Sequence, residues 1–268
     1  MNEQIVRQQI IEIGKLLYNR GLVASSDGNI SYRLDENRII ATPTQVSKGR
    51  MTEDMMAITD LNGKPLNDKR ASSELQMHLL IYRERPDIKA VVHAHPPHGT
   101  AFAVAGLSID APILSEVILT LGCVPLTAYG TPSTTELTEQ MQPFVKNHNA
   151  LLMANHGAVA YGDNLWQAFD RMETLEHTAK ITILSRALGE AQRLSNENIE
   201  KLVNIREKAG YLDKTARCQS CGYLSETNIT CDAESHDSMS HSKHLNGNGK
   251  IELTRDELIE LLAQAASV

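Results

Sequence analysis

Apolar residues recur every three or four positions in several stretches of the chain, and this spacing predicts helices. The first stretch places Val6, Ile10, Ile13 and Leu17 on one helical face. The second begins after two serines, which are favourable residues at a helix start, and ends before Pro86. The expected helices cover residues 3–20, 74–85, 113–121, 134–147, 164–189 and 195–209.

Shorter apolar runs lie between these helices and predict strands, because turn residues bound them on both sides. The expected strands cover residues 39–42, 55–59, 90–95, 124–126 and 150–160, and the last is broken by Asn155-His156-Gly157. Helices and strands are therefore intermixed, and we expect one α/β domain over residues 1–210 without an internal repeat. His98 follows Pro97 and is expected to lie in a loop.

The character of the sequence changes after this domain. Residues 211–250 are polar and contain few large apolar side chains, which is typical of a linker. Residues 251–268 again show a helical pattern, with Thr254 and Glu257 in the spacing of a capping box. An apolar stripe follows at Leu258, Ile259, Leu261, Leu262 and Ala265.

Composition and charge exclude several classes of protein. The chain has 268 residues and a net charge of −7, which argues against a nucleic-acid-binding protein with its usual basic surface. No apolar run approaches the roughly 20 residues of a membrane helix. The polar N-terminus lacks the pattern of a signal peptide. We therefore expect a cytoplasmic protein that binds neither nucleic acid nor membrane.

Three histidines stand out as candidate metal ligands. His93 and His95 are two residues apart on an expected strand, so their side chains point to the same face. His156 lies in a second strand-like run and could complete a three-histidine zinc site with an open position. Glu74 begins the helix that precedes the His93 strand, and its carboxylate could reach the metal or a substrate carbon beside it. Hydrogen-bonded core histidines are the alternative interpretation.

These residues resemble a known family, the class II aldolases and adducins. Its members include L-fuculose-1-phosphate and L-rhamnulose-1-phosphate aldolases and L-ribulose-5-phosphate 4-epimerase. The matching stretches are SSDGNISYR (25–33), ATPTQVSKGRM (41–51), residues 72–104, residues 112–137 and LLMANHGAVAYG (151–162). The resemblance implies a three-layer α/β/α sandwich around a largely antiparallel, nine-stranded sheet. It also implies a homotetramer with active sites at the subunit interfaces.

The resemblance implies roles for individual residues as well. His93, His95 and His156 match the ligands of one Zn²⁺ per subunit, and Glu74 matches the catalytic acid/base. The residues that match the substrate phosphate site are Gly28, Asn29, Thr44, Ser72 and Ser73. The implied reaction is retro-aldol cleavage of a ketose 1-phosphate, such as L-fuculose 1-phosphate, to dihydroxyacetone phosphate and lactaldehyde, with zinc as the Lewis acid. Capping of the following helix is the alternative role of Ser72 and Ser73.

Two positions depart from the pattern of the fuculose enzyme. Gln45 follows Thr44 where that enzyme has glycine. Glu116 stands where that enzyme contributes a tyrosine to a neighbouring active site, and we interpret it as a candidate catalytic residue. A carboxylate there resembles methylthioribulose-1-phosphate dehydratases, so a sugar-phosphate dehydratase or 4-epimerase remains open. Further alternatives are a solvent-facing Glu116 and a non-catalytic, adducin-like interaction protein, although adducins lack the metal histidines.

The C-terminal region carries two more hypotheses. The helix expected at 251–268 resembles encapsulation peptides, which implies binding to shell proteins and a location inside a bacterial microcompartment. The alternative is that this helix folds back onto its own tetramer. Cys218, Cys221 and Cys231 could hold a second metal, since C-x-x-C is a common ligand spacing. Free thiols, kept reduced in the cytoplasm, are the alternative.

Overall fold

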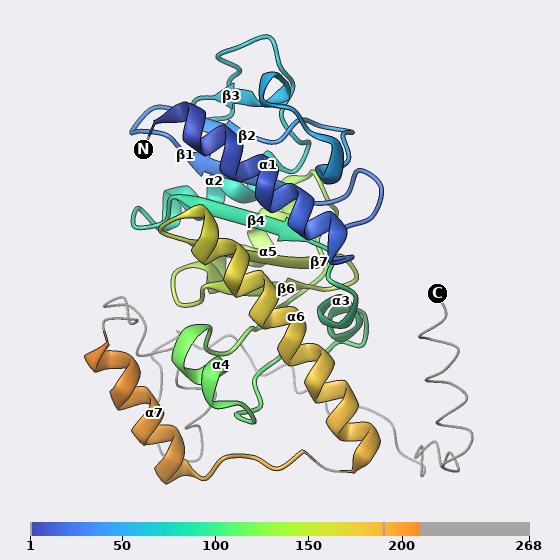
Figure 1. Cartoon of the computed structure of the whole chain (residues 1–268), viewed down its shortest axis with the longest axis vertical. Helices are drawn as coiled ribbons and strands as arrows, with labels where there is room; N and C mark the ends of the chain where they lie inside the picture. Colours follow the sequence, from blue (N-terminus) through green and yellow to red (C-terminus); the bar gives the residue numbers. More distant parts are fainter. Residues whose placement is uncertain (1, 190, 210–268) are drawn as a thin grey trace. The chain divides into compact units, whose positions relative to one another are not determined.

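The computed structural model describes residues 2–189 and 191–209 (Figure 1). The linker expected at 211–250, the helix expected at 251–268 and the cluster of Cys218, Cys221 and Cys231 lie outside the described residues. The helices are α1 Glu3–Asn19, α2 Leu75–Glu84, α3 Pro97–Val104, α4 Ser115–Thr120, α5 Thr135–Val145, α6 Leu165–Leu188 and α7 Asn196–Lys208, with short 3₁₀ turns η1 Lys48–Arg50 and η2 Glu53–Met55. The strands are β1 Asn29–Arg33, β2 Ile39–Ala41, β3 Ala57–Thr59, β4 Ala90–Ala94, β5 Leu126–Thr127, β6 Ala150–Met153 and β7 Gly157–Gly162.

The strands form one seven-stranded sheet in the order β3-β2-β1-β4-β7-β6-β5. The sheet is mixed, because β5 pairs with β6 in parallel while the other neighbouring pairs are antiparallel. The expectation of a largely antiparallel, nine-stranded sheet is therefore corrected, whereas the α/β class is confirmed. The parallel pair arises because the chain crosses through α5 between β5 and β6 instead of turning back directly.

Helices cover both faces of the sheet, and the alternation of side chains along β4 shows how. Val92 packs into the apolar cluster that contains residues of α1 and α6, whereas Val91 packs into the cluster that contains residues of α2 and α5. Figure 1 shows α1 and α6 crossing in front of the sheet. Odd-numbered residues of β4, including His93, therefore face the side of α2.

The structure corrects the expected loop at His98. Pro97 begins α3, a position where proline is favoured because it has no backbone N–H to satisfy. The Glu176 carboxylate of α6 accepts the backbone N–H groups of His98 and Gly99 and lies 2.7 Å from His98 Nδ1. A residue nearly eighty positions away thus caps this helix, so no local pattern reveals it.

The break expected within residues 150–160 is confirmed: it is a tight turn that joins two strands, β6 and β7. Met153 pairs with Gly157, and Asn155 between them adopts a left-handed conformation with φ 55°. Asparagine tolerates this conformation better than most residues other than glycine. The turn places His156 at the end of the β6–β7 hairpin, next to the end of β4.

Among the described residues, no helix has the length and hydrophobicity to cross a membrane.

Candidate metal centre

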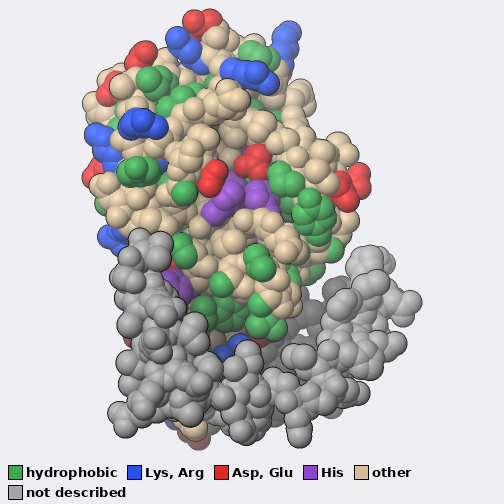
Figure 2. Space-filling model, turned by 90° about the vertical axis from the view of Figure 1, so that its right-hand side faces the viewer, with side chains coloured by type: hydrophobic (Ala, Val, Ile, Leu, Met, Phe, Trp, Pro, Cys, Tyr) green, Lys and Arg blue, Asp and Glu red, His purple; other side chains and the backbone are tan. Residues whose placement is uncertain are grey.

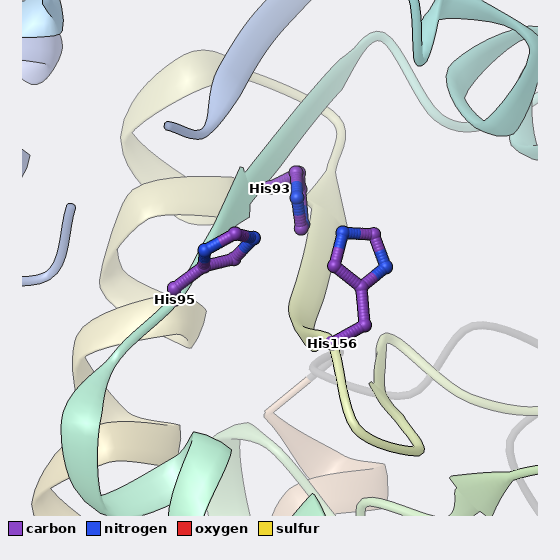
Figure 3. A group of neighbouring side chains, drawn as sticks. All are labelled: His93, His95 and His156. Atoms are coloured by element: carbon purple, nitrogen blue, oxygen red, sulfur yellow. The ribbon is translucent and has the colours of Figure 1, made fainter. Parts of the chain in front are cut away.

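Three imidazoles converge at the end of β4. His93 lies in β4, His95 follows it, and His156 comes from the turn before β7 (Figure 3). One nitrogen from each ring can be chosen so that all lie within 4.8 Å of one another. Their side chains are 0%, 29% and 7% exposed, so the group opens to solvent on the side of His95. Figure 2 shows histidines in the middle of one face with acidic side chains beside them.

The pairing of β4 with β7 fixes this convergence. Ala94 lies opposite Ala158, so the hairpin turn before β7 is held beside His95. Gly157 is required by this close approach: a Cβ there would lie 2.5 Å from His95 Cδ2 and 2.7 Å from Ala94 O. The residue that follows His156 and begins β7 must therefore be glycine, as in the Asn-His-Gly motif.

The hydrogen bonds of the rings leave nitrogens free for a metal ion. His93 Nδ1–H donates to Ala158 O at 2.9 Å, which makes Nε2 the unprotonated nitrogen. His93 Nε2, His95 Nε2 and His156 Nδ1 are buried without a hydrogen-bond partner among the described residues. Such groups are costly unless something binds them. A divalent cation held by neutral imidazoles fits this donor set.

Glu74 lies beside the histidines as expected. Its Oε1 lies 3.0 Å from His156 Nε2, and its Oε2 lies 3.3 Å from His93 Nε2. Glu74 occupies the N-cap position of α2 but makes no side-chain capping bond, so its carboxylate is free to turn toward the rings. Burial raises the pKa of this carboxyl, but His93 and His156 outweigh burial and hold the pKa well below its usual value.

We expect the metal-free protein to lose stability as the pH falls. Burial, followed by the charge of His93, lowers the pKa of His78 to about 3, and burial with the neighbouring rings lowers that of His95 to about 4. Because unfolded histidine titrates at about 6.5, the unfolded chain binds more protons over this interval, so the free energy of unfolding falls from about pH 6.5 downward. The lowered pKa of Glu74 acts in the same direction in more acid solution.

Urea unfolding of chelator-treated protein at about pH 7 and about pH 5 measures this effect. The variant His78→Gln, which removes one titrating group, should show a smaller loss between the two pH values. Equal stability of the wild type at both would contradict the expectation.

Several residues expected to bind phosphate lie next to Glu74. Asn29 Nδ2 donates to Glu74 Oε2 at 2.9 Å and to Ser72 Oγ at 3.1 Å. Ser72 Oγ also accepts the backbone N–H of Glu74 at 3.3 Å, so Ser72 has part of the capping role weighed above. Ser73 is exposed beside it at the start of α2.

Gly28 and Thr44 lie near the same group of residues, and their backbone contacts hold them there. Gly28 has φ 70° and lies against β4, so that a Cβ would come within 2.8 Å of His93 O. Thr44 N–H donates to Arg70 O at 3.1 Å, which holds the Thr44 loop beside the segment that leads into Ser72. Residues 28–29, the Thr44 loop and residues 72–74 thus bring polar groups together next to the histidines.

Gln45 is held in a left-handed conformation with φ 58°, and its side chain is exposed. Glycine adopts this conformation without the steric cost that other residues have, about 1–2 kcal/mol. We expect Gln45→Gly to raise the free energy of unfolding by up to about 1 kcal/mol, after the larger entropy of glycine in the unfolded chain is subtracted. Urea unfolding measures the change. Gln45→Ala keeps the Cβ and should give no gain, and a less stable Gln45→Gly would contradict the strain argument.

Glu116 is not among the residues that converge in one chain. It lies exposed in the first turn of α4, where its carbonyl accepts the Thr120 hydroxyl at 2.8 Å. Two contributors escaped the sequence analysis: Asp27, whose Oδ2 lies 3.4 Å from His95 Nδ1, and the buried His78. His78 stands four residues after Glu74, on the same face of a helix, and this spacing could have indicated it.

Comparison with known proteins identifies the family of this chain. The model of the family "Class II Aldolase and Adducin N-terminal domain" matches residues 8–183. The 3-oxo-tetronate 4-phosphate decarboxylase of Pectobacterium atrosepticum is 35% identical over 68% of this chain and 86% of that protein. The 5-deoxy-D-ribulose 1-phosphate aldolase of Bacillus thuringiensis is 30% identical over 76% of this chain and 96% of that protein.

Solved structures give the same result for the fold. An L-fuculose 1-phosphate aldolase superposes with a TM-score of 0.71 at 29% identity, covering 77% of this chain and 98% of that one. The L-fuculose-1-phosphate aldolase of Thermus thermophilus gives 0.62 at 30% identity, covering 70% and 97%. The chain belongs to the class II aldolase and adducin family and is one of its metal-dependent enzymes.

Proposed function

We propose that this protein cleaves a carbon–carbon bond next to a carbonyl group in a phosphorylated sugar or sugar acid. The observation that supports this most directly is the convergence of three imidazoles with Glu74, whose oxygens lie 3.0 Å and 3.3 Å from two of them. A divalent ion, for which we propose Zn²⁺, would supply Lewis-acid stabilisation of negative charge on the substrate oxygens. The carboxylate of Glu74 would exchange a proton with the reacting carbon.

The groups around Ser72 suit a phosphate anion. Ser72 and Ser73 stand at the start of α2, a helix of ten residues, whose N-terminal dipole favours negative charge. Asn29 contacts Ser72 from β1, and the Thr44 loop is bonded to the segment that leads into Ser72, so both polar residues lie close to this helix start. A substrate held there by its phosphate would place its carbonyl end toward the histidines.

Within this class of reactions, we propose retro-aldol cleavage of a deoxyketose 1-phosphate to dihydroxyacetone phosphate and an aldehyde. This reaction needs a second base, which takes the proton of the hydroxyl group on the bond that breaks. Glu116 of a neighbouring subunit would serve, because it is exposed and is not in the group of histidines beside Glu74 in its own chain. This proposal therefore requires an oligomer, for which we propose a homotetramer. A dehydratase or 4-epimerase would use the same metal and phosphate groups.

A second candidate is decarboxylation of a 3-oxo acid phosphate. Four relatives with the name 3-oxo-tetronate 4-phosphate decarboxylase, from three bacterial species, are 31–35% identical to this chain. Loss of carbon dioxide leaves negative charge that one proton donor neutralises, so this reaction needs no second base. Glu74 and the metal ligands of a single chain would suffice for it.

A substrate panel decides between these reactions. The zinc-loaded protein is incubated separately with L-fuculose 1-phosphate, L-rhamnulose 1-phosphate, 5-deoxyribulose 1-phosphate, methylthioribulose 1-phosphate and 3-oxo-tetronate 4-phosphate. Dihydroxyacetone phosphate from a ketose 1-phosphate supports the aldolase, and carbon dioxide from the oxo acid supports the decarboxylase. Loss of water alone would identify a dehydratase. No cleavage of any of the five would contradict the proposal.

The C-terminal segment adds a proposal about location that rests on its sequence alone. We propose that residues 251–268 bind shell proteins of a microcompartment. A fusion of residues 245–268 to a fluorescent reporter, in cells that make such shells, should give fluorescent foci. A reporter with Leu258 and Leu262 changed to Glu is the control, because it interrupts the apolar stripe. Diffuse fluorescence of the unchanged fusion would reject this location.

A further inference from the structure

A hydrogen-bonded network of buried polar side chains extends from Glu74 away from the metal centre. Asn29 and Ser31 in β1 point to the same face of the sheet, toward α2. His78 and Tyr82 follow Glu74 along α2 at intervals of four residues, so they share one helical face with it. His78 Nδ1 lies 2.7 Å from Ser31 Oγ, which lies 2.7 Å from Tyr82 OH, and His78 Nε2 contacts Asn29 Oδ1.

When the ring of His78 is neutral, the amide of Asn29 sets the donor and acceptor of each hydrogen bond between these side chains. Asn29 uses Nδ2 as the donor to Glu74 Oε2 and Ser72 Oγ, so its Oδ1 must accept. His78 Nε2–H is therefore the donor to Oδ1, which leaves Nδ1 as an acceptor for the Ser31 hydroxyl. Ser31 Oγ in turn accepts from Tyr82 OH. A neutral His78 ring therefore carries its proton on Nε2.

The surroundings of His78 suit this state. The residue is 1% exposed, so a charged ring would lose nearly all of its hydration. Ser31 and Tyr82 are buried as well, and neither offers a negative charge to offset a proton. Burial, with the neighbouring charge of His93, lowers the pKa of His78 to about 3, in keeping with a neutral ring at physiological pH.

We propose that His78 is a positioning residue: it fixes the amide of Asn29 so that one NH₂ group holds both the Glu74 carboxylate and the Ser72 hydroxyl. The inference rests on the proposed function, in which Glu74 transfers a proton and Ser72 contacts the phosphate. Without His78, Asn29 can turn its amide by half a rotation. Its oxygen would then face the Glu74 carboxylate, and both contacts of the NH₂ group would be lost. Because Glu74 contacts two histidines, its displacement also changes the metal centre.

A double-mutant cycle on metal affinity tests this inference without a substrate. Zinc affinity is measured by competition with a chelator for the wild type, His78→Leu, Asn29→Ala and the double variant. Changes in groups that orient a metal site typically lower affinity by about 10–100-fold. We expect His78→Leu to lower the zinc affinity of the wild type by at least about threefold, a limit set below this range because His78 acts through Asn29. In the Asn29→Ala background it should change the affinity by less than about twofold, the scatter of independent sites.

If the two single losses of zinc affinity multiply in the double variant, the inference is overturned. Such a result would show that the effect of His78 does not depend on Asn29, as expected of a residue that acts only on general stability. The control is His148→Leu: this histidine also bonds to a carbonyl, that of Phe144, but outside the site. It should leave zinc affinity unchanged although it lowers the free energy of unfolding.

A conservative variant provides a second test if His78→Leu does not fold. His78→Gln keeps an N–H donor for Asn29, so it should retain zinc affinity within about twofold of the wild type. A loss of tenfold or more in this variant would overturn the inference. Failure of the proposed function is a separate result, because it shows as wild-type protein that binds zinc but cleaves no substrate of the panel.

Discussion

Replacing His93 with alanine is expected to abolish zinc binding and to lower turnover by at least about a thousandfold, since a catalytic metal contributes several kcal/mol of transition-state stabilisation. His93 is completely buried, and its Nδ1–H is bound to Ala158 O, so its Nε2 is directed at the other two rings. Alanine removes that nitrogen and leaves a pair of imidazoles, which is fewer than the three protein ligands of a catalytic zinc. Zinc per subunit after dialysis and turnover of the best panel substrate measure the two effects.

The same experiment needs a control for damage to the fold. His93→Ala leaves a cavity in the sheet, so thermal unfolding must show that the variant is folded at the assay temperature. His95→Ala serves as a second variant, because His95 is 29% exposed and its loss opens no buried cavity. We expect both variants to lose zinc. Full zinc content and unchanged turnover in either would show that the imidazoles are core residues.

The α/β class was predictable because it depends on local patterns. The apolar spacing of residues 3–20 and 164–189 matches α1 and α6 closely, since each buries one face against the sheet. The helix at 74–85 was also predictable, because paired serines and Pro86 mark its ends. These signals act over a few residues, and neighbouring parts of the chain cannot override them easily.

Sheet pairing and α3 were not predictable in this way. The parallel pairing of β5 with β6 depends on the path of the chain through α5, and the residue types of Leu126 and Thr127 do not indicate that path. The start of α3 depends on Glu176, which comes from another helix. Such features arise from contacts between distant parts of the sequence, so they require the folded arrangement.

The candidate site likewise has parts that local patterns predict and parts that depend on contacts between distant residues. The spacing of His93 and His95 indicates a shared ligand face, and the structure brings His156 to them. The contact of Asn29 with Glu74 joins residues 45 positions apart, and no pattern in the sequence indicates it. The role of Glu116 stays a prediction, because it depends on a neighbouring subunit.

Replacing Glu74 with glutamine is expected to lower turnover by about 10²–10⁴-fold, the usual contribution of a general acid or base, while zinc remains bound. The amide has nearly the shape of the carboxylate, and its oxygen can still accept from Asn29 Nδ2. It cannot take up or release a proton at neutral pH, so the loss should appear in kcat more than in KM. Turnover and zinc per subunit, measured on the same samples, separate the two functions of this residue.

Glu176→Gln is the matched control for this experiment. Its carboxylate is 13% exposed, close to the 14% of Glu74, and it also lies against a histidine, but it caps α3 away from the metal ligands. We expect Glu176→Gln to lower stability and to keep turnover near that of the wild type. If Glu74→Gln kept more than about a tenth of the activity, proton transfer by Glu74 would be excluded, because the expected loss is at least a hundredfold. If zinc disappeared together with activity, Glu74 would act chiefly as a metal ligand, since removing only the proton acceptor leaves all three imidazoles in place.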